Sequence, residues 1–89
     1  MIQVQLIIHG KVQGVFFRQS TKEIAKKLNV KGFVRNKADG TVEVIAQGPK
    51  KDIDELIRFC NRGPRGARVD TVEIIKQQSS EGFEGFFIR

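Results

Sequence analysis

Two kinds of apolar periodicity alternate along these 89 residues, and their order limits the folds that the chain can adopt. Residues 2–9 alternate in polarity as a strand does, with Val4, Leu6 and Ile8 on one face. From Phe17 to Leu28, apolar residues instead recur every three or four positions, which is typical of an amphipathic helix. The chain therefore begins with a strand followed by a helix.

The remaining segments continue this pattern. Residues 31–36 and 41–47 read as two strands joined around Asp39-Gly40, which is a strong hairpin signal. A second helix is expected after Gly48-Pro49, with a stop at residues 61–63. A strand at about 69–76 and a short edge strand at 83–88 follow. The order predicts an α+β fold of the ferredoxin-like split β-α-β type (βαββαβ), with an antiparallel sheet and two helices on one face.

Length and composition set further limits. A chain of 89 residues has room for one modest core, so we expect residues 1–89 to form a single domain. The seven Phe, in the absence of Trp and Tyr, are expected to supply the bulk of the core volume. The only cysteine, Cys60, excludes a disulfide within the chain and lies on the apolar stripe of the second helix, where it is expected to pack in the core.

Charge and hydropathy indicate the compartment and the kind of partner. No apolar run approaches the roughly 18 residues of a membrane span, and no signal peptide pattern is present. We therefore expect a cytoplasmic protein without a membrane partner. The net charge of +6 favours anionic partners, which include small phosphates and nucleic acid.

Residues 10–18 read Gly-Lys-Val-Gln-Gly-Val-Phe-Phe-Arg and connect the first strand to the first helix. A glycine-punctuated loop can turn successive backbone N–H groups inward, and the helix start adds its positive dipole end. Arg18 adds a planar charged group that suits phosphate oxygens, and a cation at a helix start itself calls for a compensating anion. The segment predicts an anion-binding site.

Asn36 ends the second strand, and its amide could both donate to and accept from a water molecule. From composition alone, a turn residue is the simpler interpretation, because Asn tolerates unusual backbone angles. His9 has no second His or Cys near it in sequence and is expected to be structural.

The sequence lacks the residues that several phosphate chemistries require. A P-loop needs Lys and then Ser or Thr after its last glycine, whereas Gly14 is followed by Val15 and Phe16. No cysteine precedes Arg18 within the loop, so a covalent thiol mechanism is excluded. No group of His, Cys, Asp and Glu has the spacing of metal ligands, and we expect no metal or other cofactor.

Two segments together resemble the signatures of the acylphosphatase family. Residues 9–18 (HGKVQGVFFR) are similar to its phosphate loop, and residues 32–36 (GFVRN), followed by Gly40, Val42 and Gly48, are similar to its second signature. Gly63-Pro64 with Ala67 and Val69, and the closing Phe-Ile-Arg, extend the resemblance over nearly the whole chain.

The resemblance implies hydrolysis of the carboxyl-phosphate anhydride of a small acyl phosphate, with inorganic phosphate as product and competitor. Arg18 would bind the phosphoryl group and Asn36 would place the attacking water. The implied phosphate-binding loop comprises Gln13, Gly14, Val15, Phe16, Phe17 and Arg18. The expected enzyme works as a monomer, without metal and without a specific nucleic acid.

Two other readings stay open at this point. RNA-recognition domains share the order of elements, but they need exposed aromatic residues on the first and third strands, and residues 2–9 and 41–47 contain none. A regulatory or maturation domain could keep the acylphosphatase shape inside a larger system. The presence of both Arg18 and Asn36 in so short a chain favours the enzyme.

Overall fold

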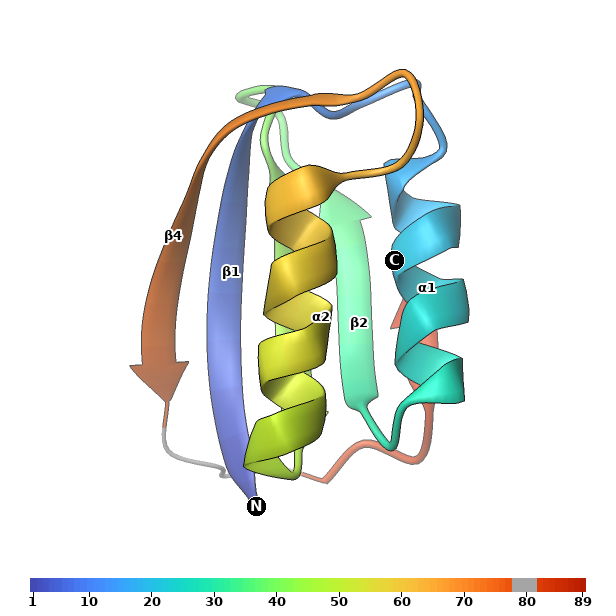
Figure 1. Cartoon of the computed structure of the whole chain (residues 1–89), viewed down its shortest axis with the longest axis vertical. Coiled ribbons are helices and arrows are strands. Elements are labelled where there is room, and N and C mark those ends of the chain that lie inside the picture. Colours follow the sequence, from blue (N-terminus) through green and yellow to red (C-terminus); the bar gives the residue numbers. More distant parts are fainter. Residues whose placement is uncertain (78–81) are drawn as a thin grey trace.

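Five strands and two helices follow one another in the computed structural model, which describes residues 1–77 and 82–89. Figure 1 shows both helices running alongside the strands on the same side of the sheet. The elements in chain order are β1 (Ile2–Lys11), α1 (Phe17–Lys27), β2 (Lys31–Asn36), β3 (Val42–Gly48), α2 (Lys50–Arg62), β4 (Arg68–Gln77) and β5 (Phe86–Ile88).

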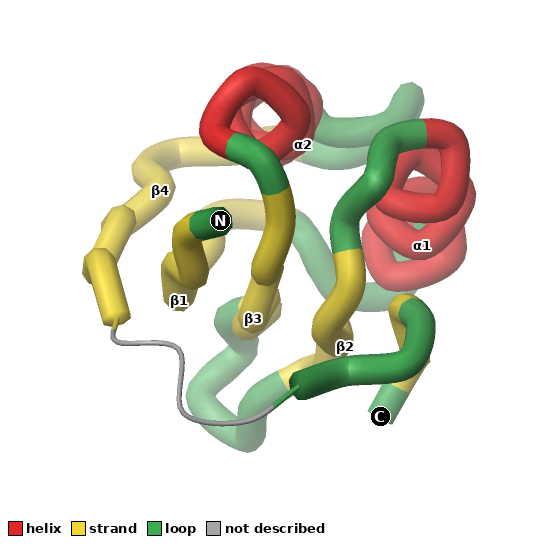
Figure 2. Tube along the Cα trace, turned by 90° about the horizontal axis from the view of Figure 1, so that it is seen from below, coloured by secondary structure: helices red, strands yellow, loops and turns green. Residues whose placement is uncertain are grey.

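The strands form one sheet in the order β4-β1-β3-β2-β5, with both helices on one face, as Figure 2 shows. The pairs β1–β3, β1–β4 and β2–β3 are antiparallel, which confirms the predicted split β-α-β arrangement. β5 is an edge strand, as expected, but it pairs with β2 in parallel. The sheet is mixed because the chain passes from the β4 edge to the opposite edge before β5 begins.

The elements agree with the predicted ones to within a few residues. β1 is longer than predicted because the ladder to β4 continues beyond a bulge at His9/Gly10, where Gly10 pairs with Val69 and Lys11 with Arg68. β5 is shorter and covers only Phe86–Ile88. The helices have 11 and 13 residues, and within the described ranges none is long and apolar enough to cross a membrane.

The core lies between the sheet and the two helices. The predicted inward rows of β1 and β3 are buried, namely Val4, Leu6, Ile8, Val42, Val44 and Ala46. The expectation that the seven Phe supply most of the core is wrong. Only Phe17, Phe59 and Phe86 are buried, and the aliphatic side chains of the strands and of α2 fill the remaining volume. The other four are partly or largely exposed, namely Phe16 before α1, Phe33 on β2, Phe83 before β5 and Phe87 on β5.

The face of the sheet without helices carries a network of hydrogen-bonded polar side chains beside the apolar residues Ile7, Ile45 and Phe33. Glu43 on β3 accepts hydrogen bonds from Gln5 and from the guanidinium of Arg35. Burial alone would raise the pKa of Glu43, but the bonds from Arg35 and Gln5 outweigh it and hold the pKa below its usual range. Since side chains alternate along a strand, the outward position of Arg35 directs Val34 and Asn36 to the helix side.

Candidate active site

A cavity of about 320 Å³ lies where the loop after β1 meets the start of α1 and the end of β2. It brings Arg18 and Asn36 into one site, as the sequence predicts for the two central residues. Gly14, Phe16 and Phe17 of the expected loop also line it. The full lining is Val12, Gly14, Phe16, Phe17, Arg18, Gln19, Asn36 and Ile88.

The loop reaches α1 through two residues with left-handed backbone angles. Gly14 has φ +74°, and an added Cβ there would meet no atom within 4 Å, so its conformation rather than crowding requires glycine. Phe16 has φ 61° and ψ 24°, and in the described ranges no other residue besides glycine has a positive φ. Such a backbone costs an aromatic residue on the order of 1–3 kcal/mol, and strain of this kind gathers at functional sites.

The start of α1 offers free donors to the cavity. Phe16 is the N-cap residue and provides no side-chain cap, and the first turn contains no acidic residue. The first backbone bond of the helix runs from the N–H of Ser20 to the carbonyl oxygen of Phe16, at 3.0 Å. The preceding N–H groups of the turn therefore have no acceptor within the helix and point their positive dipole end outward. This is the geometry with which helix starts bind phosphate.

Arg18 is half-buried at this helix start and lines the cavity. The described carboxylates all lie beyond ion-pair distance of its guanidinium. A guanidinium that has no partner among residues 1–77 and 82–89, placed beside free helix N–H groups, makes the cavity strongly attractive to a doubly charged oxyanion.

Asn36 carries the one buried side-chain oxygen or nitrogen atom, within residues 1–77 and 82–89, that has no hydrogen-bond partner. This atom is Oδ1, an acceptor, and the side chain lines the cavity. Leaving such an oxygen unsatisfied costs about 1–3 kcal/mol, so native proteins keep few of them. The atom is therefore held ready to accept a hydrogen bond from a group that enters the cavity.

The side chain of Gln13 bonds to a neighbouring turn instead of lining the cavity. Its Nε2 donates to the carbonyl oxygens of Lys37, at 2.8 Å, and Thr41, at 2.9 Å, and the side chain is not part of the cavity lining. Both acceptors belong to the turn between β2 and β3 that follows Asn36. Gln13 thus ties the loop that carries Arg18 to the turn beside Asn36. Val15 also lies outside the lining and packs against the core.

The turn itself is fixed by Asp39. Its Oδ1 accepts hydrogen bonds from the hydroxyl of Thr41, at 2.6 Å, and from the backbone N–H of Thr41, at 3.0 Å. These bonds hold the pKa of Asp39 below its usual value. The acceptors that Gln13 reaches therefore belong to an ordered hairpin turn, which agrees with the sequence signal at Asp39-Gly40.

The two other candidate groups lie away from the cavity. His9 faces Glu73 on β4, with 3.2 Å between Nε2 and Oε1. Cys60 is fully buried, and burial raises the pKa of its thiol to about 12 although a hydrogen bond with Thr21 acts in the opposite direction. Cys60 packs in the core, as the sequence predicts, and both residues lie outside the cavity lining. In the part of the chain that the structure describes, no three residues among His, Cys, Asp and Glu gather into a group.

Sequence reasoning missed three lining residues, Val12, Gln19 and Ile88. Val12 lies within the motif at residues 9–18 but just before the implied binding loop, and Gln19 directly follows the motif. Ile88 lines the cavity because it lies opposite Val34 in the parallel β2–β5 register. Val34 stands two positions before Asn36 on β2. Only the placement of β5 beside β2 reveals Ile88 as a lining residue.

This chain is similar to known proteins in both sequence and fold. The family model for acylphosphatase matches residues 4–88. An acylphosphatase of Rubrobacter xylanophilus is 47% identical over 87 residues, which cover 98% of this chain and 79% of the relative. The crystal structure of acylphosphatase from Bacillus subtilis aligns with a TM-score of 0.96 at 32% identity, over 100% of this chain and 99% of that one.

A third similarity concerns a larger protein. The crystal structure of full-length HypF in the phosphate- and nucleotide-bound form aligns with a TM-score of 0.83 at 31% identity. It covers 100% of this chain but 12% of that one, so the same architecture also occurs within a much longer polypeptide. The match of the family model over nearly the whole sequence and the identity to curated relatives place this chain in the acylphosphatase family.

Proposed function

We propose that this acylphosphatase hydrolyses acyl phosphates by metal-independent attack of a water that Asn36 positions. The phosphoryl group would be held by Arg18 and by loop N–H groups between Gly14 and Arg18. The observation that carries the proposal is the buried, unpartnered Oδ1 of Asn36 in the same cavity as Arg18 and the free start of α1. One wall binds the anion, and the other presents an acceptor for the nucleophile.

The chemistry of the substrate explains how so few residues suffice. Phosphoryl transfer passes through a loose transition state, so positioning and charge stabilisation dominate catalysis. The oxygen of water bonds to phosphorus while the bond to the carboxylate oxygen breaks. The leaving acid has a pKa of roughly 4–5, so it departs as the anion without a general acid.

The proton of the water also needs an acceptor. Among the residues that line the cavity, Arg18 is a permanent cation, and the amide of Asn36 is not a base at neutral pH. We assign this role to a phosphoryl oxygen of the substrate. Asn36 would then act by orientation, holding one water hydrogen at Oδ1 so that a lone pair faces the phosphorus.

Nucleic acid is a poorer candidate ligand. The face of the sheet without helices, where RNA-recognition domains stack bases, carries Gln3, Gln5, Glu43 and Gln47 on β1 and β3. These side chains are hydrogen-bonded to each other or to neighbouring strands, and neither strand contains an aromatic residue. The polar network supports the small-molecule site instead.

Two substitutions test the proposed division of roles. Arg18→Ala should weaken the inhibition constant of inorganic phosphate and lower kcat, because the guanidinium contacts the phosphoryl group in both the ground state and the transition state. Asn36→Ala should lower kcat by about 2–4 kcal/mol of transition-state stabilisation while phosphate affinity changes little. Asn36→Asp should be as poor or worse, since it places a negative charge beside an anionic substrate.

The measurements are kcat on acetyl phosphate and the inhibition constant of phosphate, in excess EDTA, where wild-type activity should persist. Arg62→Ala and Asn61→Ala, at exposed positions near the end of α2, are matched controls for loss of charge and of an amide. Near-normal kcat in Asn36→Ala would remove the water-positioning role. Loss of activity with EDTA that a divalent metal restores would overturn the metal-independent mechanism.

A further inference from the structure

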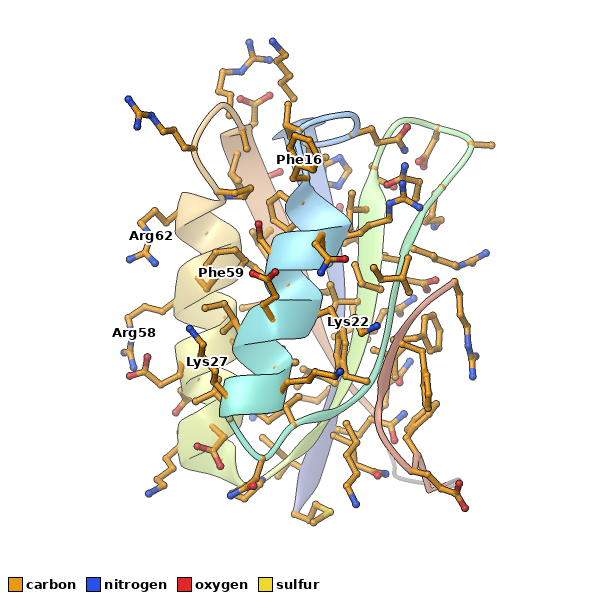
Figure 3. All side chains as sticks on the ribbon, turned by 90° about the vertical axis from the view of Figure 1, so that its right-hand side faces the viewer. Phe16, Lys22, Lys27, Arg58, Phe59 and Arg62 are labelled. Atoms are coloured by element: carbon orange, nitrogen blue, oxygen red, sulfur yellow. The ribbon has the colours of Figure 1, made fainter. Side chains whose placement is uncertain are left out.

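Phe16 is an anomaly that phosphate binding does not explain. Its side chain is 81% exposed, whereas the next residue, Phe17, is 1% exposed and packs against Phe59 with ring centroids 6.0 Å apart. Figure 3 shows Phe16 at the start of α1, beyond the packed helix interface that contains Phe59. The chain thus keeps a large apolar ring in water, on a strained backbone, at the rim of the cavity. The ring contributes little to the core, which leaves the cavity as its place of action.

The cavity is also larger and less polar than a phosphoryl group requires. Phosphate fills roughly the space of two or three water molecules, about 30 Å³ each, which leaves most of the 320 Å³ for the rest of the substrate. Alongside Arg18 and Asn36, the lining includes the apolar side chains of Val12, Phe16 and Ile88. A site with one charged end and apolar walls suits a ligand that is anionic at one end and apolar at the other.

The reaction geometry selects Phe16 among these walls. In-line displacement places the leaving carboxylate on the opposite side of phosphorus from the attacking water. Asn36 belongs to β2, and Ile88 lies on β5 directly beside it, so both are on the side of the water. Phe16 comes from the loop before α1, a different element. Val12, in the same loop, is 1% exposed and presents almost no surface, so the Phe16 ring is the apolar surface on this side that an acyl group can contact.

We propose that Phe16 is a specificity-determining residue that binds the acyl group, and that the chain prefers acyl phosphates with bulky apolar acyl groups over acetyl phosphate. The inference rests on the proposed hydrolysis of acyl phosphates and adds the substrate class. Contact with the ring is similar in the ground state and the transition state, so it lowers KM and changes kcat little. We expect KM for a bulky acyl phosphate to be about tenfold below KM for acetyl phosphate.

The test compares acetyl phosphate with cyclohexanecarbonyl phosphate. Both release aliphatic acids of similar acidity, so the comparison reports on acyl size rather than on leaving-group ability. Phe16→Ala should remove most of the tenfold difference in KM, and Phe16→Leu should retain part of it. Phe87→Ala is the matched control, because Phe87 is also exposed, at 45%, but lies outside the cavity. It should keep the full difference.

The outcomes separate the inference from the function on which it rests. If wild type hydrolyses both substrates with equal KM, or if Phe16→Ala raises both KM values by the same factor, the specificity role of Phe16 is wrong while acyl phosphate hydrolysis stands. The inhibition constant of inorganic phosphate, measured on each variant, shows whether the loop itself has been disturbed. Hydrolysis of neither substrate would overturn both proposals together.

Discussion

At the scale of single residues, this protein places unfavourable groups where a ligand can use them. Asn36 holds a buried acceptor without a partner, and Phe16 combines a left-handed backbone with an exposed ring. Each lowers the stability of the free protein by an amount comparable to one good contact. Both residues line the same cavity, whereas His9 and Cys60, which are satisfied or buried in the ordinary way, lie outside it.

Relief of the backbone strain at Phe16 should stabilise the protein at the expense of function. We expect Phe16→Asn to raise the free energy of unfolding by about 1 kcal/mol, because Asn tolerates the left-handed region far better than an aromatic residue. Urea denaturation measures the change. Phe87→Asn, at an exposed strand position without a positive φ, is the control and should bring no gain. A destabilised Phe16→Asn variant would mean that the ring contributes more to folding than its exposure indicates.

At the scale of elements, the site depends on a cross-link between two loops. The amide of Gln13 links the loop before α1 to the β2–β3 turn. Arg18 on α1 directly follows that loop, and Asn36 on β2 directly precedes that turn. The relative position of Arg18 and Asn36 is therefore set partly by a side chain that does not line the cavity.

Gln13→Met tests this cross-link, since it keeps the length of the side chain and removes both donors. We expect a loss of about 1–2 kcal/mol in the free energy of unfolding and a fall in kcat of about tenfold or more, because small misplacements are costly in catalysis. The phosphate inhibition constant should change less, since the loop N–H groups stay in place. The check is kcat on acetyl phosphate at a temperature where the variant is fully folded. Normal kcat there would show that the loops hold their positions without Gln13.

The order of elements could be predicted from the sequence, because each helix and each long strand carries its own periodicity. The inward rows of β1 and β3 and the hairpin at Asp39-Gly40 are local features of this kind. The parallel pairing of β5 could not be predicted, since it depends on where the chain goes after it leaves β4. For the same reason Ile88 was missed. The helical spacing that begins at Phe17 placed that ring on the apolar face of the helix, whereas no pattern indicated that Phe16 lies exposed at the rim of the cavity.

At the scale of the whole molecule, the ion pair on the helix-free face links stability to pH. The folded protein holds the pKa of Glu43 below its ordinary value of 4.5, so the carboxylate stabilises the fold above that pH. The stabilisation is lost as the pH falls through the lowered pKa of the folded state. Glu43→Gln should therefore be less stable than wild type at pH 7, by about 1–3 kcal/mol, and the gap should narrow as the pH falls below 4.5.

Urea denaturation of both proteins between pH 7 and pH 3 measures this gap. Glu55→Gln is the matched control, since Glu55 is exposed and pairs with Arg58 on the surface of α2. Exposed pairs contribute little, so this variant should follow wild type across the range. If the difference in free energy of unfolding between wild type and Glu43→Gln stays constant down to pH 3, the pKa of Glu43 is not lowered by folding as described.

The cavity also has a consequence for how long the folded state survives. Its walls come from six residues between Val12 and Gln19, from Asn36 and from Ile88, and Ile88 joins them only when β5 pairs with β2. The loop proposed to hold phosphate is itself tied by Gln13 to Lys37 and Thr41. Contacts so distant in sequence tend to form late, so the folding transition state should offer phosphate little to bind. We expect inorganic phosphate to slow unfolding in stopped-flow experiments and to leave the refolding rate unchanged, whereas a faster refolding rate would mean that the site forms early. The lifetime of the folded chain, and not only its equilibrium stability, would then rise with the concentration of its own reaction product.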